Sequence, residues 1–324
     1  MNIFVTMNKE TKKEATVISA TGLWCEILTG DNHIIKCRIK GNMRIKGIKS
    51  TNPVAVGDRV IYTCDDEGND GVITRVCDRR NYIVRRSVNL SKRTHILAAN
   101  IDMAFVVVTL AMPATTTTFI DRILASCRAY GIDATLVFNK MDIYTPEGIE
   151  AIGELRCLYE KIGYPTITTS AITGEGIEEL RASMKDKTCM FTGHSGCGKS
   201  SLINAVEPSL DIRTGEISST HAQGQHTTTF ARMHLLPFGG AIIDTPGIRG
   251  FGMVDMKGAE VGDYFPEIFE IKDQCRFNNC THTEEPGCAV LAAVEAGDIA
   301  MSRFESYLSI LRGDEGPYRE DIYK

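Results

Sequence analysis

The sequence predicts a multidomain protein with an N-terminal β-barrel, a central α/β domain with a parallel sheet, and a C-terminal, mainly helical domain that binds a metal ion. Three observations predict this order. Short β-type segments fill the first part of the chain, strands alternate with amphipathic helices from residue 100 onward, and cysteines and a histidine cluster near the C-terminus. We expect the domains to span residues 1–95, 96–255 and 256–324.

Composition restricts the class of protein. The 324 residues are 43% hydrophobic and 24% charged, which is typical of a soluble globular chain. The longest apolar stretch, residues 104–112, is too short to span a bilayer, and the first ten residues lack the pattern of a secretory signal. Eleven cysteines in such a chain favour reduced thiols over a disulfide framework. We therefore expect a cytoplasmic protein with no membrane partner.

The N-terminal part predicts a small barrel of five short strands, separated by turns rich in Gly, Asn and Asp. The predicted strands cover residues 15–20, 23–28, 33–40, 59–64 and 71–77. This length and number of strands fit an oligonucleotide-binding (OB) barrel. Alternating residues of the third strand form an apolar face and a basic face: Ile35, Cys37 and Ile39, and Lys36, Arg38 and Lys40.

The charge is distributed unevenly along the chain. Residues 1–95 contain 17 basic and 10 acidic side chains, a net charge of +7, whereas the remainder carries −12. Basic side chains continue beyond the third strand and into the connector: Arg44, Lys46, Lys49, Arg79, Arg80, Arg85, Arg86, Lys92 and Arg93. This asymmetry favours RNA as a partner of the barrel, and an ordinary solvated surface is the alternative. Because aromatic residues are few (Trp24, Tyr62, Tyr82), we expect backbone contacts rather than base readout.

The central part alternates strands and helices, as a parallel sheet requires. The predicted strands cover residues 104–110, 134–139, 166–170, 189–192, 231–237 and 241–243. The predicted helices cover residues 119–130, 146–162 and 177–184, and another begins near residue 201. The segment 209–229 has no periodicity and predicts a loop.

The stretch GHSGCGKS follows a short apolar strand and matches the phosphate-loop pattern GxxxxGK[ST]. Backbone N–H groups of such a loop and the following helix N-terminus bind phosphates. Lys199 would reach the terminal phosphates, and the Ser200 hydroxyl would hold Mg²⁺. The predicted nucleotide contacts are Gly193, His194, Ser195, Gly196, Cys197, Gly198, Lys199, Ser200 and Ser201. The pattern therefore predicts a bound nucleoside triphosphate.

The tetrapeptide NKMD at the end of a strand matches the guanine-recognition pattern NKxD. The Asp142 carboxylate can accept from N1–H and the exocyclic amine of guanine, and adenine lacks this pair of donors. Asn139 would hold the loop and the base edge, the Lys140 stem can lie on the ring, and the backbone of Ser170 and Ala171 would contact the guanine carbonyl. A phosphate-loop ATPase or kinase is the alternative that Asp142 opposes.

The tetrapeptide DTPG follows the apolar strand 241–243 and matches the pattern DxxG. Asp244 would hold Mg²⁺, through water, and the Gly247 N–H would sense the γ-phosphate. Thr228, in the stretch HTTT, is the predicted hydroxyl ligand of Mg²⁺. Many GTPases place a water-orienting Gln directly after DxxG, but Ile248 stands here and cannot orient water. A second hypothesis therefore stays open, an RNA-binding scaffold that uses GTP only as a structural ligand.

The C-terminal part contains the pattern C-x4-C-x-H-x5-C, formed by Cys275, Cys280, His282 and Cys288. Three thiols and one imidazole within fourteen residues suit a closed tetrahedral Zn²⁺ site. Predicted helices at 289–296 and 302–311 follow it. Buried or incidental cysteines are the alternative, but their density here favours zinc.

The order of the motifs is unusual, because NKMD and SA precede the phosphate loop and DTPG instead of following them. All these motifs follow the C-terminal ends of strands, so a circular permutation leaves the site intact. The complete pattern resembles the RsgA/YjeQ family of circularly permuted ribosome-assembly GTPases.

That resemblance implies a cytoplasmic GTPase that uses GTP/GDP, Mg²⁺ and one structural Zn²⁺. It also implies binding to the small (30S) ribosomal subunit and 16S rRNA, stimulation of hydrolysis by the subunit, and action late in subunit maturation. The residue that the resemblance implicates in catalysis is His226, and we expect Thr228 and Lys199 to act with it. We expect a monomer.

Overall fold

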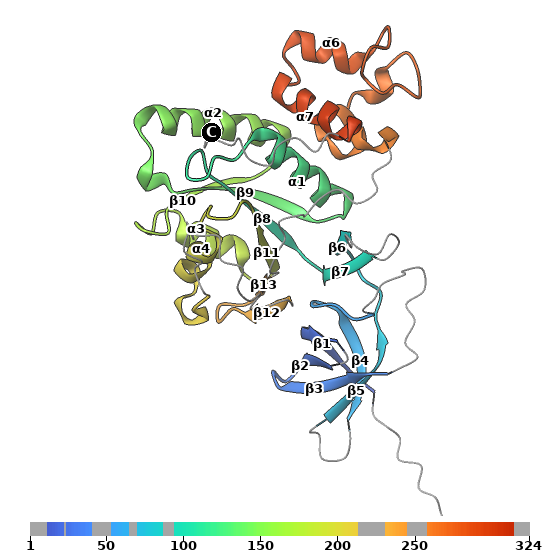
Figure 1. Cartoon of the computed structure of the whole chain (residues 1–324), viewed down its shortest axis with the longest axis vertical. Coiled ribbons are helices and arrows are strands. Elements are labelled where there is room, and N and C mark those ends of the chain that lie inside the picture. The colour runs from blue at the N-terminus through green and yellow to red at the C-terminus, as the bar shows by residue number, and fades with distance from the viewer. Residues whose placement is uncertain are drawn as a thin grey trace, which may run out of the picture. The chain divides into compact units, whose positions relative to one another are not determined.

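The computed structural model describes residues 12–22, 24–40, 53–64, 70–86, 94–212, 231–244 and 258–313. The chain divides into two compact units, the first built mainly from residues 1–101 and the second mainly from residues 102–324 (Figure 1). The domain boundaries that we expect from the sequence stay predictions. Among the described residues, no helix is both long enough and apolar enough to cross a bilayer.

Five strands of the first unit close a barrel. They are β1 (Lys13–Thr21), β2 (Trp24–Thr29), β3 (Ile34–Ile39), β4 (Arg59–Cys64) and β5 (Asp70–Val76). Neighbouring strands are antiparallel except β3 and β5, which are parallel, and the pairing of β1 with β4 closes the ring. Side chains buried inside it include Val17, Ile27, Cys37, Val60 and Ile73. The predicted barrel is confirmed.

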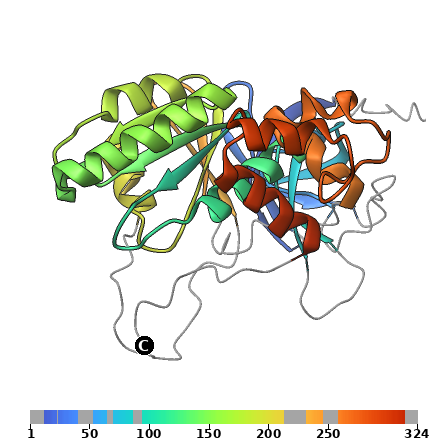
Figure 2. The same ribbon diagram turned by 90° about the horizontal axis from the view of Figure 1, so that it is seen from above.

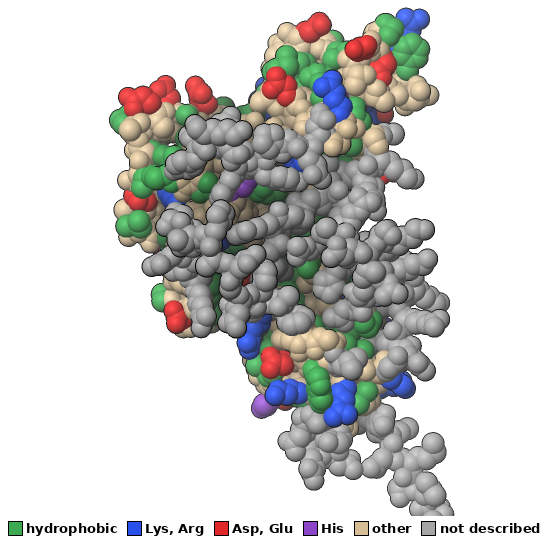
Figure 3. Space-filling model, viewed as in Figure 1, with side chains coloured by type: hydrophobic (Ala, Val, Ile, Leu, Met, Phe, Trp, Pro, Cys, Tyr) green, Lys and Arg blue, Asp and Glu red, His purple; other side chains and the backbone are tan. Residues whose placement is uncertain are grey.

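The two faces of β3 differ as its alternating sequence predicts. Cys37 is buried in the barrel core, whereas Lys36 and Arg38 are exposed. Trp24, directly opposite Arg38 on β2, is 40% exposed and carries the Arg38 guanidinium 4.6 Å from its ring centre. Tyr62 belongs to the core, so it is not available for stacking. Lys and Arg side chains are visible over the barrel in Figure 3.

The connector after the barrel contains a hairpin that the sequence analysis missed. It consists of β6 (Tyr82–Arg86) and β7 (Thr94–Ala99), which pair in antiparallel fashion. Ile83 and Ile96 are buried in it. The Asn81 side chain closes its base, because its Nδ2 donates to the Ile101 carbonyl and its Oδ1 accepts from the Ile101 N–H.

Four parallel strands form the sheet of the second unit: β8 (Met103–Val108), β9 (Asp133–Asn139), β10 (Thr166–Thr169) and β11 (Thr188–Thr192). Their order is β10-β9-β8-β11. The loops that carry the NKMD, SA and phosphate-binding motifs follow β9, β10 and β11, so all three lie at the C-terminal end of the parallel strands. The last five residues of β8 are all buried, as expected for a strand covered on both faces. Two short strands follow later in the chain, β12 (Arg232–Leu235) and β13 (Ala241–Asp244).

The helices of this α/β region are α1 (Thr117–Ala129), α2 (Pro146–Ile162), α3 (Ile177–Met184) and α4 (Lys199–Val206). Side-chain caps explain where two of them begin. The hydroxyls of Thr116 and Thr145 accept from the backbone N–H groups of Phe119 and Gly148, and Pro146 occupies the first helical position of α2.

The C-terminal region is mainly helical, as predicted. It contains α5 (Pro266–Phe269), α6 (Ala289–Ala296) and α7 (Met301–Arg312), together with the 3-10 helices η3 (Gly258–Tyr264) and η4 (Lys272–Gln274). Figure 2 shows α6 and α7 grouped with these short helices. Their shared core includes Val261, Phe265, Ile268, Val290 and Tyr307.

A buried charged network attaches this region to α1. Arg303 of α7 is 1% exposed, and its Nη1 donates to Asp121 of α1 at 2.6 Å. Its Nε and Nη2 donate to both carboxylate oxygens of Glu267 in α5, at 2.7 and 3.1 Å. The Tyr159 hydroxyl of α2 donates to the same oxygen of Asp121. Burial raises the pKa of the Asp121 carboxyl, and the Arg303 charge opposes that rise.

Candidate nucleotide site and metal cluster

The phosphate loop begins where β11 ends, and its backbone requires glycine at several positions. Gly193, Gly196 and Gly198 all have positive φ, at 143°, 86° and 98°. A Cβ at Gly193 would lie 2.5 Å from the Val107 carbonyl oxygen, and one at Gly198 would lie 2.3 Å from Asn139 Nδ2. The loop therefore packs closely against β8 and against the residue that opens the NKMD motif.

Lys199 is the first residue of α4, and its ammonium group lies inside the loop. Its Nζ donates to the carbonyl oxygens of Gly193 at 2.9 Å and of His194 at 2.6 Å. Ser195, Gly196 and Ser201 are exposed, and Ser200 is half-buried. An exposed loop around a fixed positive charge, at the start of a helix, is a geometry that binds phosphate.

Two other residues of the loop face the interior. The His194 ring stacks on Phe119 of α1 with 3.7 Å between ring centres. Cys197 is buried, and burial raises the pKa of its thiol, although the nearby Lys199 charge opposes the rise. Both side chains therefore pack against the protein interior and support the loop on its buried side, and neither forms part of its exposed surface.

Asn139, the last residue of β9, links three segments of the site. Its Nδ2 donates to the Cys197 carbonyl of the phosphate loop at 2.8 Å. Its Oδ1 accepts from the hydroxyl of Thr169, the last residue of β10, at 3.1 Å. The buried amide therefore fixes the phosphate loop against the ends of two neighbouring strands. The next residue, Lys140, has a left-handed backbone (φ 66°), and its Nζ donates to the Met112 carbonyl.

Asp142 is exposed at the rim of this site and is oriented by Ser170. The Ser170 hydroxyl donates to Asp142 Oδ1 at 2.5 Å and accepts from the backbone N–H groups of Ile172 and Thr173. The structure thus brings the NKMD and SA segments together. From the sequence we expected the backbone of Ser170 and Ala171 to matter, and the orienting role of the Ser170 side chain was missed.

The structure describes the remaining predicted residues only in part. Asp244 is the last residue of β13. His226, Thr228 and Gly247 lie outside the described residues. Their roles in catalysis, Mg²⁺ binding and γ-phosphate sensing stay predictions.

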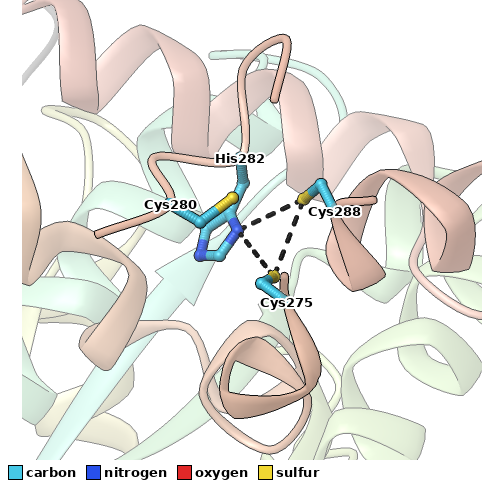
Figure 4. A group of neighbouring side chains, drawn as sticks. All are labelled: Cys275, Cys280, His282 and Cys288. Atoms are coloured by element: carbon cyan, nitrogen blue, oxygen red, sulfur yellow. Dashed lines mark hydrogen bonds between the residues drawn. The ribbon is translucent and has the colours of Figure 1, made fainter. Parts of the chain in front are cut away.

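The four predicted metal ligands converge in the C-terminal region (Figure 4). One ligand atom from each of Cys275, Cys280, His282 and Cys288 lies within 4.8 Å of all the others. The Sγ atoms of Cys275 and Cys288 are 3.8 Å apart, and His282 Nδ1 lies 3.5 and 3.4 Å from them. A tetrahedron with the usual Zn–S and Zn–N bonds has edges of about 3.5–3.8 Å. The cluster therefore has the donors and the spacing to hold a metal ion.

Without a metal ion, the histidine of the cluster has the protonation state of a ligand, whereas the thiol of Cys280 does not. Burial, reinforced by the neighbouring thiols, raises the pKa of Cys280 to about 12, and burial lowers the pKa of His282. The imidazole is therefore neutral, as a ligand must be, while a metal ion would have to displace thiol protons.

Glu285 organises the loop between the ligands and was not identified from the sequence. Its carboxylate accepts from the backbone N–H and hydroxyl of Thr281, at 2.7 and 2.6 Å, and from the Thr283 N–H at 2.8 Å. Although burial acts to raise it, these hydrogen bonds hold the pKa of Glu285 well below its usual range. Since Thr281 and Thr283 flank His282, the carboxylate fixes the backbone of that ligand.

Comparisons with known proteins agree with this architecture. Residues 76–254 match the family model of the RsgA GTPase, and residues 14–73 match that of the RsgA N-terminal domain. The chain is 53% identical to the small ribosomal subunit biogenesis GTPase RsgA of Flavobacterium psychrophilum, over 95% of each chain. It is 52% identical to the protein of the same name from Bacteroides fragilis, over 94% of this chain and 98% of that one.

Solved structures are similar over nearly the whole chain. YjeQ from Thermotoga maritima superposes with a TM-score of 0.77 at 36% identity, and covers 94% of this chain and 98% of its own. YloQ, a circularly permuted GTPase, superposes with a TM-score of 0.74 at 27% identity, and covers 95% and 96%. The circular permutation indicated by the motif order is therefore shared with a solved relative.

Proposed function

This chain belongs to the RsgA family of GTPases, and from that membership we propose that it hydrolyses GTP during maturation of the small ribosomal subunit. The observation that carries the proposal is the position of Asn139. One amide joins the loop that would bind phosphates to the strand ends that would bind the base. That arrangement suits a ligand that carries both a guanine and a phosphate chain.

The proposed roles follow the motifs. GTP or GDP binds between residues 193–201 and the guanine-recognition residues around Asp142. Lys199 contacts the terminal phosphates, and Mg²⁺ is held by Ser200, Thr228 and Asp244. His226 positions the attacking water, since Ile248 cannot, and Gly247 senses the γ-phosphate.

Zinc is the proposed occupant of the Cys/His cluster, because three thiols and a neutral imidazole at tetrahedral spacing suit it better than Mg²⁺ or Ca²⁺. When bound, the ion would hold the C-terminal region together and take no part in hydrolysis.

We further propose that the basic face of the barrel, with Lys36 and Arg38, contacts 16S rRNA. We also propose that the protein acts as a monomer and that it acts in the cytoplasm.

The proposal is tested by measuring multiple-turnover GTP hydrolysis with and without purified small ribosomal subunits, at fixed salt, with ATP as a control. We expect slow hydrolysis alone and strong stimulation by the subunit that is specific to GTP. If GTP bound but its hydrolysis was never faster than the ATP control, the scaffold hypothesis would replace the enzyme.

The base specificity has its own test in Asp142→Asn. An amide cannot accept from both N1–H and the exocyclic amine, so we expect GTP affinity to fall by about a hundredfold or more. Xanthosine triphosphate, whose 2-oxygen can accept from the new amide, should bind better than it does to the unchanged protein. Equal GTP affinity in the variant would contradict guanine recognition by Asp142, and tight ATP binding would favour an ATPase.

A further inference from the structure

Tyr144 lies just beyond the NKMD motif, in the short extended segment before α2, and is half-buried. Its hydroxyl makes two hydrogen bonds to backbone groups. It accepts from the Leu110 N–H at 3.0 Å and donates to the Asn139 carbonyl at 3.1 Å. One side-chain atom therefore connects the end of β9 to the chain that continues from β8.

The segment bonded by Tyr144, residues 109–116, is itself well organised. The Thr109 N–H donates to the Thr115 hydroxyl at 3.2 Å, and the Thr115 N–H donates to the Thr109 carbonyl at 2.8 Å. This β8–α1 loop also accepts a hydrogen bond from Lys140 at the Met112 carbonyl. Tyr144 and Lys140 therefore fasten the NKMD segment to this loop at two points.

The hydrogen bond from Tyr144 falls where the backbone of the guanine-recognition segment is least favourable. The Asn139 carbonyl belongs to the peptide that leads into Lys140, whose φ of 66° is unusual for a residue with a side chain. A donor on that carbonyl fixes the orientation of the peptide. Because Asp142 follows two residues after Lys140, the orientation of this peptide and the Ser170 hydroxyl together position its carboxylate.

We propose that Tyr144 is a positioning residue for guanine recognition. Its hydroxyl contacts no nucleotide, but it holds the Asn139–Lys140 peptide so that the Asp142 carboxylate meets both N1–H and the exocyclic amine of the base. The proposal rests on the nucleotide site proposed above, and it adds a residue outside the NKxD pattern to the groups that determine base specificity.

The test compares the Tyr144→Phe protein with the unchanged full-length chain, with GDP and inosine diphosphate as probes. Inosine lacks the exocyclic amine, so the ratio of the two affinities measures how well Asp142 is aligned. We expect GDP affinity to fall about tenfold, because the peptide that positions Asp142 is no longer held in place before the base binds. Inosine diphosphate should lose less, so that the ratio shrinks.

Tyr164→Phe is the matched control, because the Tyr164 hydroxyl is buried without a hydrogen-bond partner among the described residues. Its removal should leave both affinities unchanged. A ratio in Tyr144→Phe equal to that of the unchanged chain, whatever happens to the melting temperature, would overturn the role of Tyr144. If the unchanged chain itself bound neither probe, the proposed nucleotide site would be wrong and this inference with it.

Discussion

The phosphate loop with the NKMD and SA segments and the metal cluster all belong to the second compact unit, but the two sites are built in opposite ways. Around the phosphate loop, Asn139 and Ser170 hydrogen bond to groups of neighbouring segments, and Lys199 hydrogen bonds to carbonyls of the loop itself. The protein itself therefore supplies the bonds that form the site. In the cluster, three thiols and an imidazole converge at a small hydrophobic core that includes Cys275 and Cys288 themselves. Their mutual contacts are weak compared with bonds to a metal ion. The fold therefore builds the nucleotide site, whereas the metal ion would stabilise the fold of the C-terminal region.

If the metal ion stabilises the C-terminal region, the largest loss of stability is expected when the metal ligand Cys288 is replaced. Replacement by Ser removes one of the four ligands, and structural zinc contributes on the order of 10 kcal/mol to the folding of small domains. We expect Cys288→Ser to lose its zinc, measured by metal analysis, and to unfold residues 258–313. Cys157→Ser is the control, because Cys157 is exposed and lies outside the cluster. Full zinc content in the Cys288 variant would contradict the assignment.

A smaller effect is expected where the C-terminal region attaches to α1. Arg303→Met leaves Asp121 without its positive partner in a buried position, and breaking a buried ion pair from one side costs about 3–5 kcal/mol. Urea denaturation should show this loss in the zinc-loaded protein. Arg312→Met, an exposed change in the last turn of the same helix, should cost less than about 0.5 kcal/mol. Equal stability of the two variants would mean that the network does not hold the region in place.

A third change tests the nucleotide side of the comparison. Gly198→Ala introduces a Cβ against Asn139 Nδ2 and forces a side chain into φ 98°. We expect GDP affinity to fall by roughly thirtyfold, about 2 kcal/mol, while zinc content is unchanged. Gly174→Ala is the control that measures backbone strain alone. Gly174 also has a positive φ, but no atom lies within 4 Å of its added Cβ, so that variant has no steric clash. An equal loss of GDP affinity in both variants would argue against the Asn139 contact.

Sequence reasoning predicts best where the chemistry is local. The phosphate loop needs glycines at fixed spacing, and the metal ligands lie within fourteen residues of one another, so both patterns can be found without a fold. The five strands of the barrel could be predicted because their alternating residues face either the core or the solvent.

The features that could not be predicted depend on distant partners. Arg303 and Asp121 are 182 positions apart, and nothing local marks an arginine as buried. Tyr144 follows a known motif, but its bond to Leu110 spans 34 positions. The β6–β7 hairpin was mistaken for a connector because its interpretation rested on its basic residues, Arg85, Arg86, Lys92 and Arg93, although Ile83 and Ile96 are buried.

The comparison is tested most directly by hydrogen–deuterium exchange of the full-length protein before and after metal chelation. We predict that residues 275–288 and the neighbouring helices α6 and α7 lose protection, while β9, β11 and the residues around Asn139 keep it. Loss of protection in both regions at once, or in neither, would contradict the claim that the metal ion stabilises the C-terminal region and the fold alone builds the nucleotide site.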